Sequence, residues 1–311
     1  MKVAILGATG FLGSNLARNL SQLENLEVAS LARAPVHRGS GEAVTPEDYY
    51  LPLIERLNPD VVINCVALVG HEICNINERR AYALNADFPK TLAQRLSQTN
   101  TKLLHFSTDA VFSGDQTTEA LYSEGDETHP FSVYGSSKLL GETAVLEAAS
   151  QHTVLRTNFF GWSRNGDKGV LDYFLHGLQS TEHTIGYGQY FVTSAFTDDL
   201  SKSVAELLHL NLEGLYHLTS SDRMSKYAFG REVARTFGFN CEKILKSDPS
   251  AWRGEGISTR DLSLSNIKIQ NAGVTIPSQR DGIQNARKSL SRMLDEDFLL
   301  DKYWRRVLTS P

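Results

Sequence analysis

The chain has 311 residues, of which 41% are hydrophobic and 22% charged, and its formal net charge is −5. This composition is typical of a globular protein with one large domain or two domains that share a cleft. The negative balance gives no reason to expect a nucleic acid or an anionic membrane as a partner, and no apolar run approaches the ~20 residues that span a bilayer. Three cysteines cannot all pair with one another, so we expect a reduced, cytoplasmic protein without a disulfide framework.

A strand, a glycine-rich turn and a helix are predicted at the start of the chain. Residues 3–6 are a short buried apolar run, and residues 14–20 have helical spacing of apolar side chains. A glycine turn between a strand and a helix lets the backbone approach a pyrophosphate, which the helix N-terminus then faces. We therefore assign the turn and the start of the helix to cofactor binding, namely Gly7, Thr9, Gly10, Phe11, Leu12 and Gly13.

A second strand is predicted at residues 26–32 and is followed by Arg33. NAD-specific sites usually carry an acidic residue at this point, whereas an arginine can pair with the 2′-phosphate of NADP. The sequence therefore favours NADP(H), with NAD(H) as the alternative if Arg33 is only a solvated loop cation.

Further strands are predicted at residues 59–65, 103–108 and 153–156, with helices at 53–57 and 81–97 between them. This alternation predicts an α/β fold with a Rossmann-type doubly wound parallel sheet, whose cofactor lies across the carboxyl ends of the strands. From about residue 157 the alternation loosens, although helices are expected at 171–178, 201–210 and 226–237. We expect a dinucleotide-binding domain at 1–156 with a returning segment at about 195–222, and a smaller α/β substrate-binding domain at 157–194 and 223–311.

Tyr134 and Lys138 are four residues apart in a predicted helix, so both side chains lie on one face. An ammonium group beside a phenol favours the phenolate and lowers its pKa, which suits the phenol to proton exchange near neutral pH. The same spacing also occurs on solvated helix faces, so the pair alone does not identify a site.

Taken together, these motifs resemble the extended short-chain dehydrogenase/reductase family, and within it the branch of the dTDP-4-dehydrorhamnose reductases. The matching segments are residues 7–13, 59–64, 107–114 and 124–138, in the family's order, and more loosely 156–161, 214–218 and 259–264. Residues 71–75, 188–194 and 260–261 depart from the patterns that this branch carries around its substrate. The departures leave the particular sugar open.

The resemblance implies roles for individual residues. Tyr134 is the proton donor to an alkoxide, Lys138 holds the nicotinamide ribose, and Thr108 is the third catalytic group. Further cofactor contacts are implied at the strand ends and on a neighbouring helix, at Cys65, Val66, Ala67, Asn85 and Ser107. Substrate contacts are implied at Thr108, Asp109, Asn158, Phe159 and Arg260, the last for a diphosphate. No metal site is expected.

The resemblance thus implies NADPH-dependent reduction of a 4-keto group on a nucleotide-linked deoxysugar, in nucleotide-sugar or polysaccharide biosynthesis. The expected partner is the small-molecule substrate, and a homodimer is a further expectation. Two alternatives stay open: an epimerase or dehydratase on the same fold, and a non-catalytic NADP-binding regulatory subunit. Ala110 stands where dehydratases usually carry a glutamate, which favours simple reduction.

Overall fold

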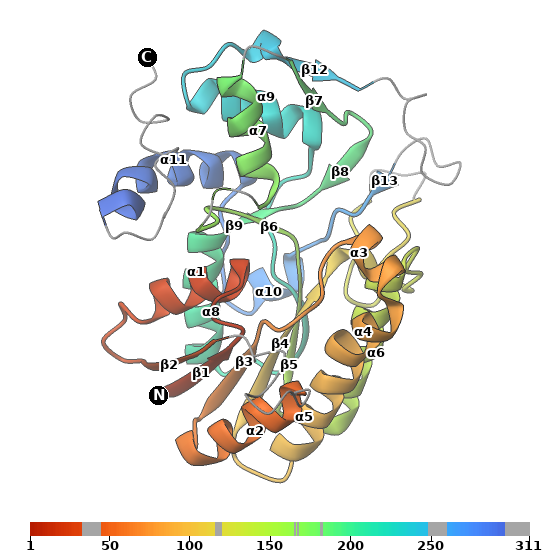
Figure 1. Ribbon diagram of the computed structural model, residues 1–311, viewed down its shortest axis with the longest axis vertical. Coiled ribbons are helices and arrows are strands. Elements are labelled where there is room, and N and C mark those ends of the chain that lie inside the picture. Colours follow the sequence, from red (N-terminus) through yellow and green to blue (C-terminus); the bar gives the residue numbers. More distant parts are fainter. Residues whose placement is uncertain are drawn as a thin grey trace, which may run out of the picture. The chain divides into compact units, whose positions relative to one another are not determined.

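The computed structural model describes residues 1–32, 45–115, 120–164, 166, 168–180, 183–247 and 260–295 (Figure 1). The chain divides into two compact units. Unit 1 comprises Met1–Ser113, Glu124–Thr157 and Ser201–His217, and unit 2 comprises Gly114–Ser123, Asn158–Leu200 and Leu218–Pro311. Neither unit is a single stretch of chain, because each is formed by segments that are separated in the sequence by parts of the other unit.

Unit 1 is built on a six-stranded sheet with the order β10-β5-β4-β3-β1-β2, and every neighbouring pair of strands is parallel. The strands are β1 Lys2–Leu6, β2 Glu27–Leu31, β3 Val61–Asn64, β4 Lys102–Thr108, β5 Thr153–Thr157 and β10 Gly214–His217. The central strands are almost wholly buried because helices cover both faces, which explains their continuous apolar runs. The predicted Rossmann-type α/β fold is confirmed.

Helices cover the two faces of this sheet (Figure 1). On one face lie α1 Phe11–Leu20 and the unit 1 part of α8 Thr197–Leu210. On the other lie α2 Pro46–Leu57, α5 Phe88–Leu96 and α6 Val133–Ala148, with α3 His71–Ile76 and α4 Glu78–Tyr82 beside α6. The core beneath the second group contains Tyr50, Ile54, Phe88, Leu92 and Val145.

The helix predicted at residues 81–97 is interrupted. Between α4 and α5 the chain forms a single π-helical turn, Ala83–Asp87. Such turns are rare and frequently lie at functional sites. Asn85, which belongs to the predicted cofactor set, lies in this turn and is fully buried.

Unit 2 is a smaller α/β assembly with three short sheets. Strand β6 Phe159–Phe160 pairs with β9 Ala195–Phe196, and β7 Thr184–Gly186 pairs with β12 Ile244–Lys246. The third sheet has the order β11-β8-β13, formed by Met224–Ser225, Tyr190–Val192 and Arg260–Asp261. Helices α7 Val170–Gln179, α9 Lys226–Thr236 and α11 Gln279–Asp295 enclose a core that includes Phe160, Trp162, Phe174, Phe229 and Leu290. A short further helix is α10 Ile267–Asn271.

None of the described helices is both long and apolar enough to cross a membrane.

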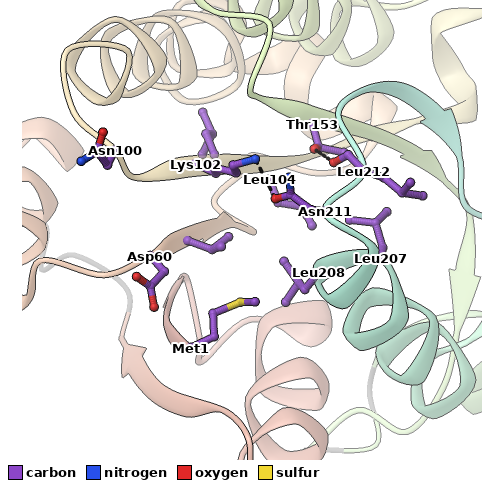
Figure 2. Close-up of a pocket in the computed structure, with 12 residues that line it drawn as sticks. Met1, Asp60, Asn100, Lys102, Leu104, Thr153, Leu207, Leu208, Asn211 and Leu212 are labelled. Carbon is purple, nitrogen blue, oxygen red and sulfur yellow. Dashed lines mark hydrogen bonds between the residues drawn. The ribbon is translucent and has the colours of Figure 1, made fainter.

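A cavity of about 170 Å³ opens in unit 1 at the amino ends of the parallel strands (Figure 2). Met1, Asp60, Lys102, Leu208 and Asn211 are among its lining residues. The Lys102 ammonium lies 2.6 Å from both the Asn211 amide oxygen and a Glu213 carboxylate oxygen, so its charge is already paired. The cavity is at the opposite strand ends from Thr108, and no predicted catalytic residue lines it.

Candidate active site

The glycine turn after β1 has the geometry of a dinucleotide cradle. Gly7 has a φ of +73°, which side chains rarely tolerate, and a Cβ at Gly13 would lie 2.4 Å from the Gly7 carbonyl oxygen. Helix α1 begins after Gly10 with no side-chain cap and with no acidic residue in its first turn. The positive dipole end of the helix therefore suits phosphate oxygens. The residues of this turn fit the pyrophosphate of a dinucleotide.

The other predicted cofactor residues are distributed around this turn. Cys65, Val66 and Ala67 follow β3, and a Cβ on Gly7 would lie 3.3 Å from the Cys65 carbonyl carbon and from a Val66 methyl group. Ser107 lies on β4, and among the described residues its buried hydroxyl has no hydrogen-bond partner. Arg33, on which the NADP preference depended, lies outside the described residues.

Thr108 ends β4 and caps the short 3₁₀ turn Asp109–Val111. Its hydroxyl accepts a hydrogen bond from Ala110 N at 3.2 Å and lies 3.0 Å from the Asp109 carboxylate, to which it can donate. The same hydroxyl lies near the phenol of Tyr134 and lowers its pKa. The structure thus brings together two of the three predicted catalytic residues at the carboxyl end of the sheet.

Tyr134 lies in the first turn of α6, whose N-terminus is fixed by Ser132. The Ser132 hydroxyl accepts from Gly135 N at 3.2 Å and lies 2.8 Å from Nδ1 of His71. The His71 ring meets the Tyr134 ring edge-on, with 5.7 Å between centroids. The sequence interpretation gave His71 no role in the site, yet it contacts both the cap of the helix and the phenol ring.

The predicted direction of the Tyr134 pKa is wrong for this structure. Desolvation raises the pKa of the phenol above its ordinary value, and the nearby Thr108 hydroxyl only partly opposes this, while Asp109 and Cys74 add to the rise. Lys138 does not contribute, because its amine is directed elsewhere. The phenol therefore stays protonated at neutral pH, which is the state that a proton donor requires.

The Lys138 amine is buried beneath the sheet's carboxyl end. It donates to the Phe106 carbonyl oxygen at 2.6 Å and lies 3.2 Å from Nε2 of His105. His105 Nδ1 in turn lies 3.1 Å from the Asn64 amide nitrogen. The sequence interpretation did not single out Asn64 or His105. Each is a polar residue in an otherwise apolar buried strand, and a buried polar side chain needs a hydrogen-bond partner, so this pattern could have pointed to them. The two residues are direct neighbours across β3 and β4.

Burial lowers the pKa of Lys138 to about 8, partly opposed by Glu142 and Cys65. A lysine whose folded pKa lies below its unfolded value of 10.5 binds fewer protons when folded, so its burial costs stability below pH 8 and this cost disappears as the pH rises to 10.5. We expect the free energy of unfolding of the wild type, relative to Lys138→Met, to increase between about pH 8 and 10.5 with a slope of at most about 1.4 kcal/mol per pH unit. Urea denaturation of both proteins across this range measures it, and a flat difference would contradict the lowered pKa.

Asn85 connects the π-helical turn to two other segments. Its amide oxygen accepts from Leu68 N at 2.8 Å, and its amide nitrogen donates to Leu68 O at 2.9 Å and to the Ser137 hydroxyl at 3.0 Å. It therefore holds the loop after β3 against the helix that carries Tyr134 and Lys138. The Asn85 amide thus uses both of its N–H donors and one of the two lone pairs of its oxygen within the protein.

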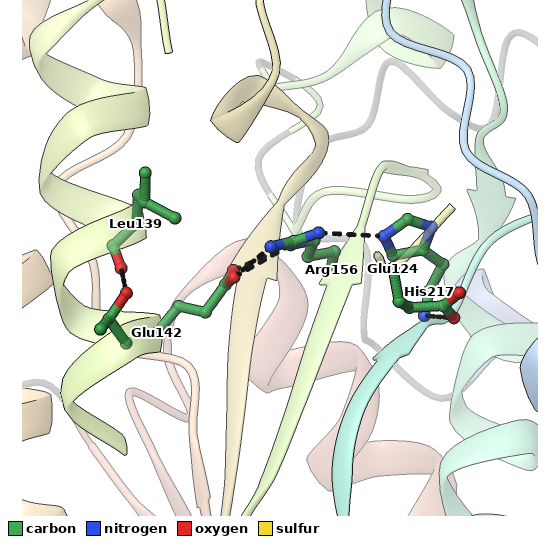
Figure 3. A network of polar contacts seen from close by, with 6 residues as sticks. Glu124, Leu139, Glu142, Arg156 and His217 are labelled. Atoms are coloured by element: carbon green, nitrogen blue, oxygen red, sulfur yellow. Dashed lines mark hydrogen bonds and ion pairs between the residues drawn. The ribbon is translucent and has the colours of Figure 1, made fainter. Parts of the chain in front are cut away.

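A buried ion pair ties α6 to β5 (Figure 3). Arg156 Nε lies 3.0 and 3.1 Å from the two carboxylate oxygens of Glu142, and both side chains are almost completely buried. Arg156 also contacts His217 Nε2 at 3.4 Å and lies over the Phe112 ring, 5.0 Å from its centroid. Glu142 follows Lys138 by one helical turn, so this pair fixes the rotation of α6 about its axis.

The other predicted substrate residues belong to unit 2. Asn158 accepts from Ser194 through its amide oxygen at 2.5 Å, and Phe159 is half-buried in β6. Arg260 lies in β13 with a buried side chain, and the neighbouring Asp261 accepts from Arg223 at 2.6 Å. Asp261 stands where the family pattern has proline, and here its carboxylate is held by this arginine.

Comparison with known proteins agrees with the fold of the chain. The family model described as RmlD substrate binding domain matches residues 1–292. A protein of Haloferax volcanii named "Probable low-salt glycan biosynthesis reductase" is 30% identical over 79% of this chain and 84% of its own length. A dTDP-4-dehydrorhamnose reductase of Burkholderia thailandensis is 28% identical over 90% of this chain and 96% of its own length.

Solved structures share the fold. A dTDP-4-dehydrorhamnose reductase from Clostridium acetobutylicum has a TM-score of 0.80 at 23% identity, and the match covers 94% of this chain and all of that chain. A dTDP-4-dehydrorhamnose reductase from Bacillus anthracis, solved in complex with NADP, has a TM-score of 0.78 at 21% identity over 93% of this chain and 99% of that one. The chain belongs to the RmlD substrate-binding domain family.

Proposed function

We propose that this protein reduces a 4-keto group on a nucleotide-linked deoxysugar with NADPH, in nucleotide-sugar or glycan biosynthesis. The observation that carries the proposal is the buried phenol of Tyr134, which lies near the Thr108 hydroxyl at the carboxyl end of β4 and stays protonated because burial raises its pKa. The glycine turn at the same edge of the same sheet supports a dinucleotide cofactor beside it. Relatives named as reductases of this class, and a structural neighbour in complex with NADP, support the substrate class and the cofactor.

In this mechanism the chain's own residues bind, orient and deliver a proton. A bound reduced nicotinamide supplies the hydride, and the resulting alkoxide needs a proton. The Tyr134 hydroxyl donates that proton, and the Thr108 hydroxyl orients the phenol and the carbonyl oxygen. Lys138 would hold the nicotinamide ribose hydroxyls, with Asn85 keeping the surrounding loop and α6 in register. Asp109, Asn158, Phe159 and Arg260 are proposed as substrate contacts.

The direct test offers the purified protein NADPH and a panel of nucleotide-linked 4-keto deoxysugars. Absorbance of the reduced nicotinamide should fall with at least one member of the panel. A changed sugar without net oxidation of NADPH would instead indicate an epimerase or a dehydratase. If no member is reduced and Tyr134→Phe behaves as the wild type does, the reductase proposal is wrong.

The glycine turn gives a separate test of cofactor binding. Gly13→Ala places a Cβ 2.4 Å from the Gly7 carbonyl oxygen, so either the turn or α1 must shift. We expect the Kd for NADPH to rise about tenfold or more, because overpacking of this size costs on the order of 1–3 kcal/mol. Fluorescence titration measures the Kd. Gly125→Ala is the matched control, because its added Cβ meets no atom within 4 Å, and equal affinity in both variants would contradict the assignment.

We further propose that unit 1 binds the dinucleotide and that unit 2 supplies nucleotide-sugar contacts in addition to those of Thr108 and Asp109, in a cytoplasmic enzyme that forms a homodimer. Exposed apolar side chains around α3 and on α6, namely Val69, Ile73, Ile76 and Leu140, support a pairing surface on unit 1. Light scattering of the purified protein tests the pairing, and the mass of a single chain at all concentrations would contradict it.

A further inference from the structure

The imidazole of His71 contacts three residues at the start of α6, the helix that carries Tyr134. His71 is the first residue of α3, and its Nδ1 lies 2.8 Å from the hydroxyl oxygen of Ser132. Its ring centroid lies 4.9 Å from that of Phe131, with 34° between the planes, and 5.7 Å from that of Tyr134, with 86° between them. One side chain from another helix therefore contacts the residue before the cap of α6, the cap itself and the phenol ring.

The start of α6 is weak on its own. Tyr134 is the second residue of this helix and lies in its first turn, whose backbone N–H groups have no partner within the helix. The next residue is Gly135, and glycine inside a helix costs roughly 0.5–1 kcal/mol relative to alanine. A better helix former does not fit there, because a Cβ at Gly135 would overlap the carbonyl oxygen of Ala110. The turn therefore depends on its cap, the Ser132 hydroxyl, which accepts from Gly135 N at 3.2 Å.

The Ser132 hydroxyl can bond to His71 and to the helix at the same time. A serine hydroxyl has one donor and two lone pairs, so its oxygen can accept from Gly135 N and still bond to Nδ1 of His71 in either direction. The bond to His71 keeps this oxygen where the helix needs it. Aromatic pairs add about 0.5–1.5 kcal/mol beyond their burial, so the edge-on contact with His71 also opposes rotation of the Tyr134 ring.

His71 is itself held by the loop that precedes it. The carbonyl oxygen of Gly70, whose φ is +105°, accepts from Cys74 N at 3.0 Å. The Cys74 side chain is fully buried, and its thiol donates to Leu68 O at 3.4 Å. Leu68 is bonded through both of its backbone groups to Asn85, which also bonds to α6. His71 and α6 therefore share one support, as accurate placement of a reacting group requires.

We propose that His71 is a positioning residue, which holds Ser132 and the ring of Tyr134 and thereby keeps the phenol in the orientation from which it donates its proton. His71 acts through these two residues and needs no contact with the substrate. The inference rests on the proposed function for the proton transfer, whereas the contacts of His71 do not depend on it. A reacting group that is misplaced by about 1 Å can lose about 10²-fold in rate, so loose support at this point is costly.

Replacement of His71 by alanine removes the bond to Ser132 and both ring contacts. We expect kcat to fall about tenfold to 10²-fold, because the phenol spends most of its time in unproductive orientations. The Kd for NADPH should change little, because the residues that His71 holds are at the start of α6 and not at the glycine turn. Steady-state NADPH oxidation with the best substrate of the panel and fluorescence titration measure the two quantities.

An unchanged kcat in His71→Ala would overturn the proposal. A loss of NADPH affinity as large as the loss of kcat would also overturn it, because it would indicate general damage to the site. His129→Ala is the matched control. His129 precedes α6 in the same unit and is exposed, with its Nε2 3.4 Å from the carboxylate of exposed Glu127. This variant should have the kcat and the Kd of the wild type.

Two other replacements of His71 separate its contacts. His71→Asn can place an amide group where Nδ1 lies and keep the bond to Ser132, whereas His71→Phe keeps a ring beside Tyr134. Each should recover part of the kcat that His71→Ala loses. In a Ser132→Ala background, His71→Asn should have no advantage over His71→Ala, because the partner of its amide is gone. If neither replacement is faster than His71→Ala, these contacts do not position the phenol and the proposal is wrong.

The contact with Tyr134 can be observed without substrate. In protein labelled with [¹³Cε]-tyrosine, the ring current of His71 displaces the signal of Tyr134, which Tyr134→Phe assigns. We expect this signal to move in His71→Ala and to stay near its wild-type position in His71→Phe and His129→Ala. An unchanged signal in His71→Ala would contradict the proposal whatever the activity. If the wild type oxidises no NADPH with any member of the panel, the reductase assignment fails, and the spectra still decide whether His71 holds the phenol.

Discussion

Replacement of Tyr134 by phenylalanine is expected to lower kcat by about 10²- to 10⁴-fold, the usual contribution of a positioned general acid. The substitution removes only the hydroxyl, which lies near Thr108 and is held in the protonated state by desolvation. The ring should keep its edge-on contact with His71, so α6 and the cofactor site should stay in place. The Kd for NADPH is therefore expected to change little while the rate of reduction collapses.

The measurement is steady-state NADPH oxidation with the best substrate of the panel, together with fluorescence titration of the cofactor. Tyr49→Phe is the matched control: it removes a phenol hydroxyl from half-buried Tyr49 in α2, which packs on the hydrophobic core of the same unit. Its kcat should match that of the wild type. If Tyr134→Phe retains more than about a tenth of the activity, the general acid is a different group.

Most of unit 1 could be predicted from local sequence because each of its elements has a local cause. Buried parallel strands such as β3 and β4 are short apolar runs that do not depend on distant partners for their recognition. The turn at Gly7 needs a positive φ, and the close approach at Gly13 needs a missing side chain. Such requirements leave a visible trace in the sequence, so both the fold class and the cradle could be predicted.

The features that could not be predicted depend on contacts between distant segments. The partners of Lys138 are set by the register that makes Asn64 and His105 neighbours across two strands, and no spacing within the sequence reports a register. The pKa of Tyr134 depends on the balance between desolvation and a charged neighbour, and Lys138 proved to be directed at Phe106 and His105 instead. The π-helical turn at Asn85 likewise requires the Leu68 loop that it binds.

The largest change in stability is expected from Arg156→Met, which leaves the Glu142 carboxylate without its cation. Both side chains are almost inaccessible, with exposures of 4% and 2%, so water cannot replace the lost partner. Breaking such a pair from one side costs about 3–5 kcal/mol in the free energy of unfolding. The loss of the guanidinium over Phe112 adds to this. Urea denaturation followed by circular dichroism measures the change.

The surface pair Arg95–Glu55 provides the control, because it has a similar N–O distance of 3.0 Å but exposures of 62% and 64%. Arg95→Met should cost less than about 1 kcal/mol, since exposed pairs contribute little. The double variant Arg156→Met with Glu142→Leu should recover most of the stability lost in the single variant, because it leaves no buried charge unpaired. If the double variant is as unstable as Arg156→Met alone, the cost comes from lost packing around β5 and α6 and not from the orphaned carboxylate. If the double variant instead recovers stability but not NADPH oxidation, the pair has two separate roles. The fold would tolerate an apolar contact at this place, whereas the rotation of α6 that presents Tyr134 and Lys138 would need the bidentate ion pair.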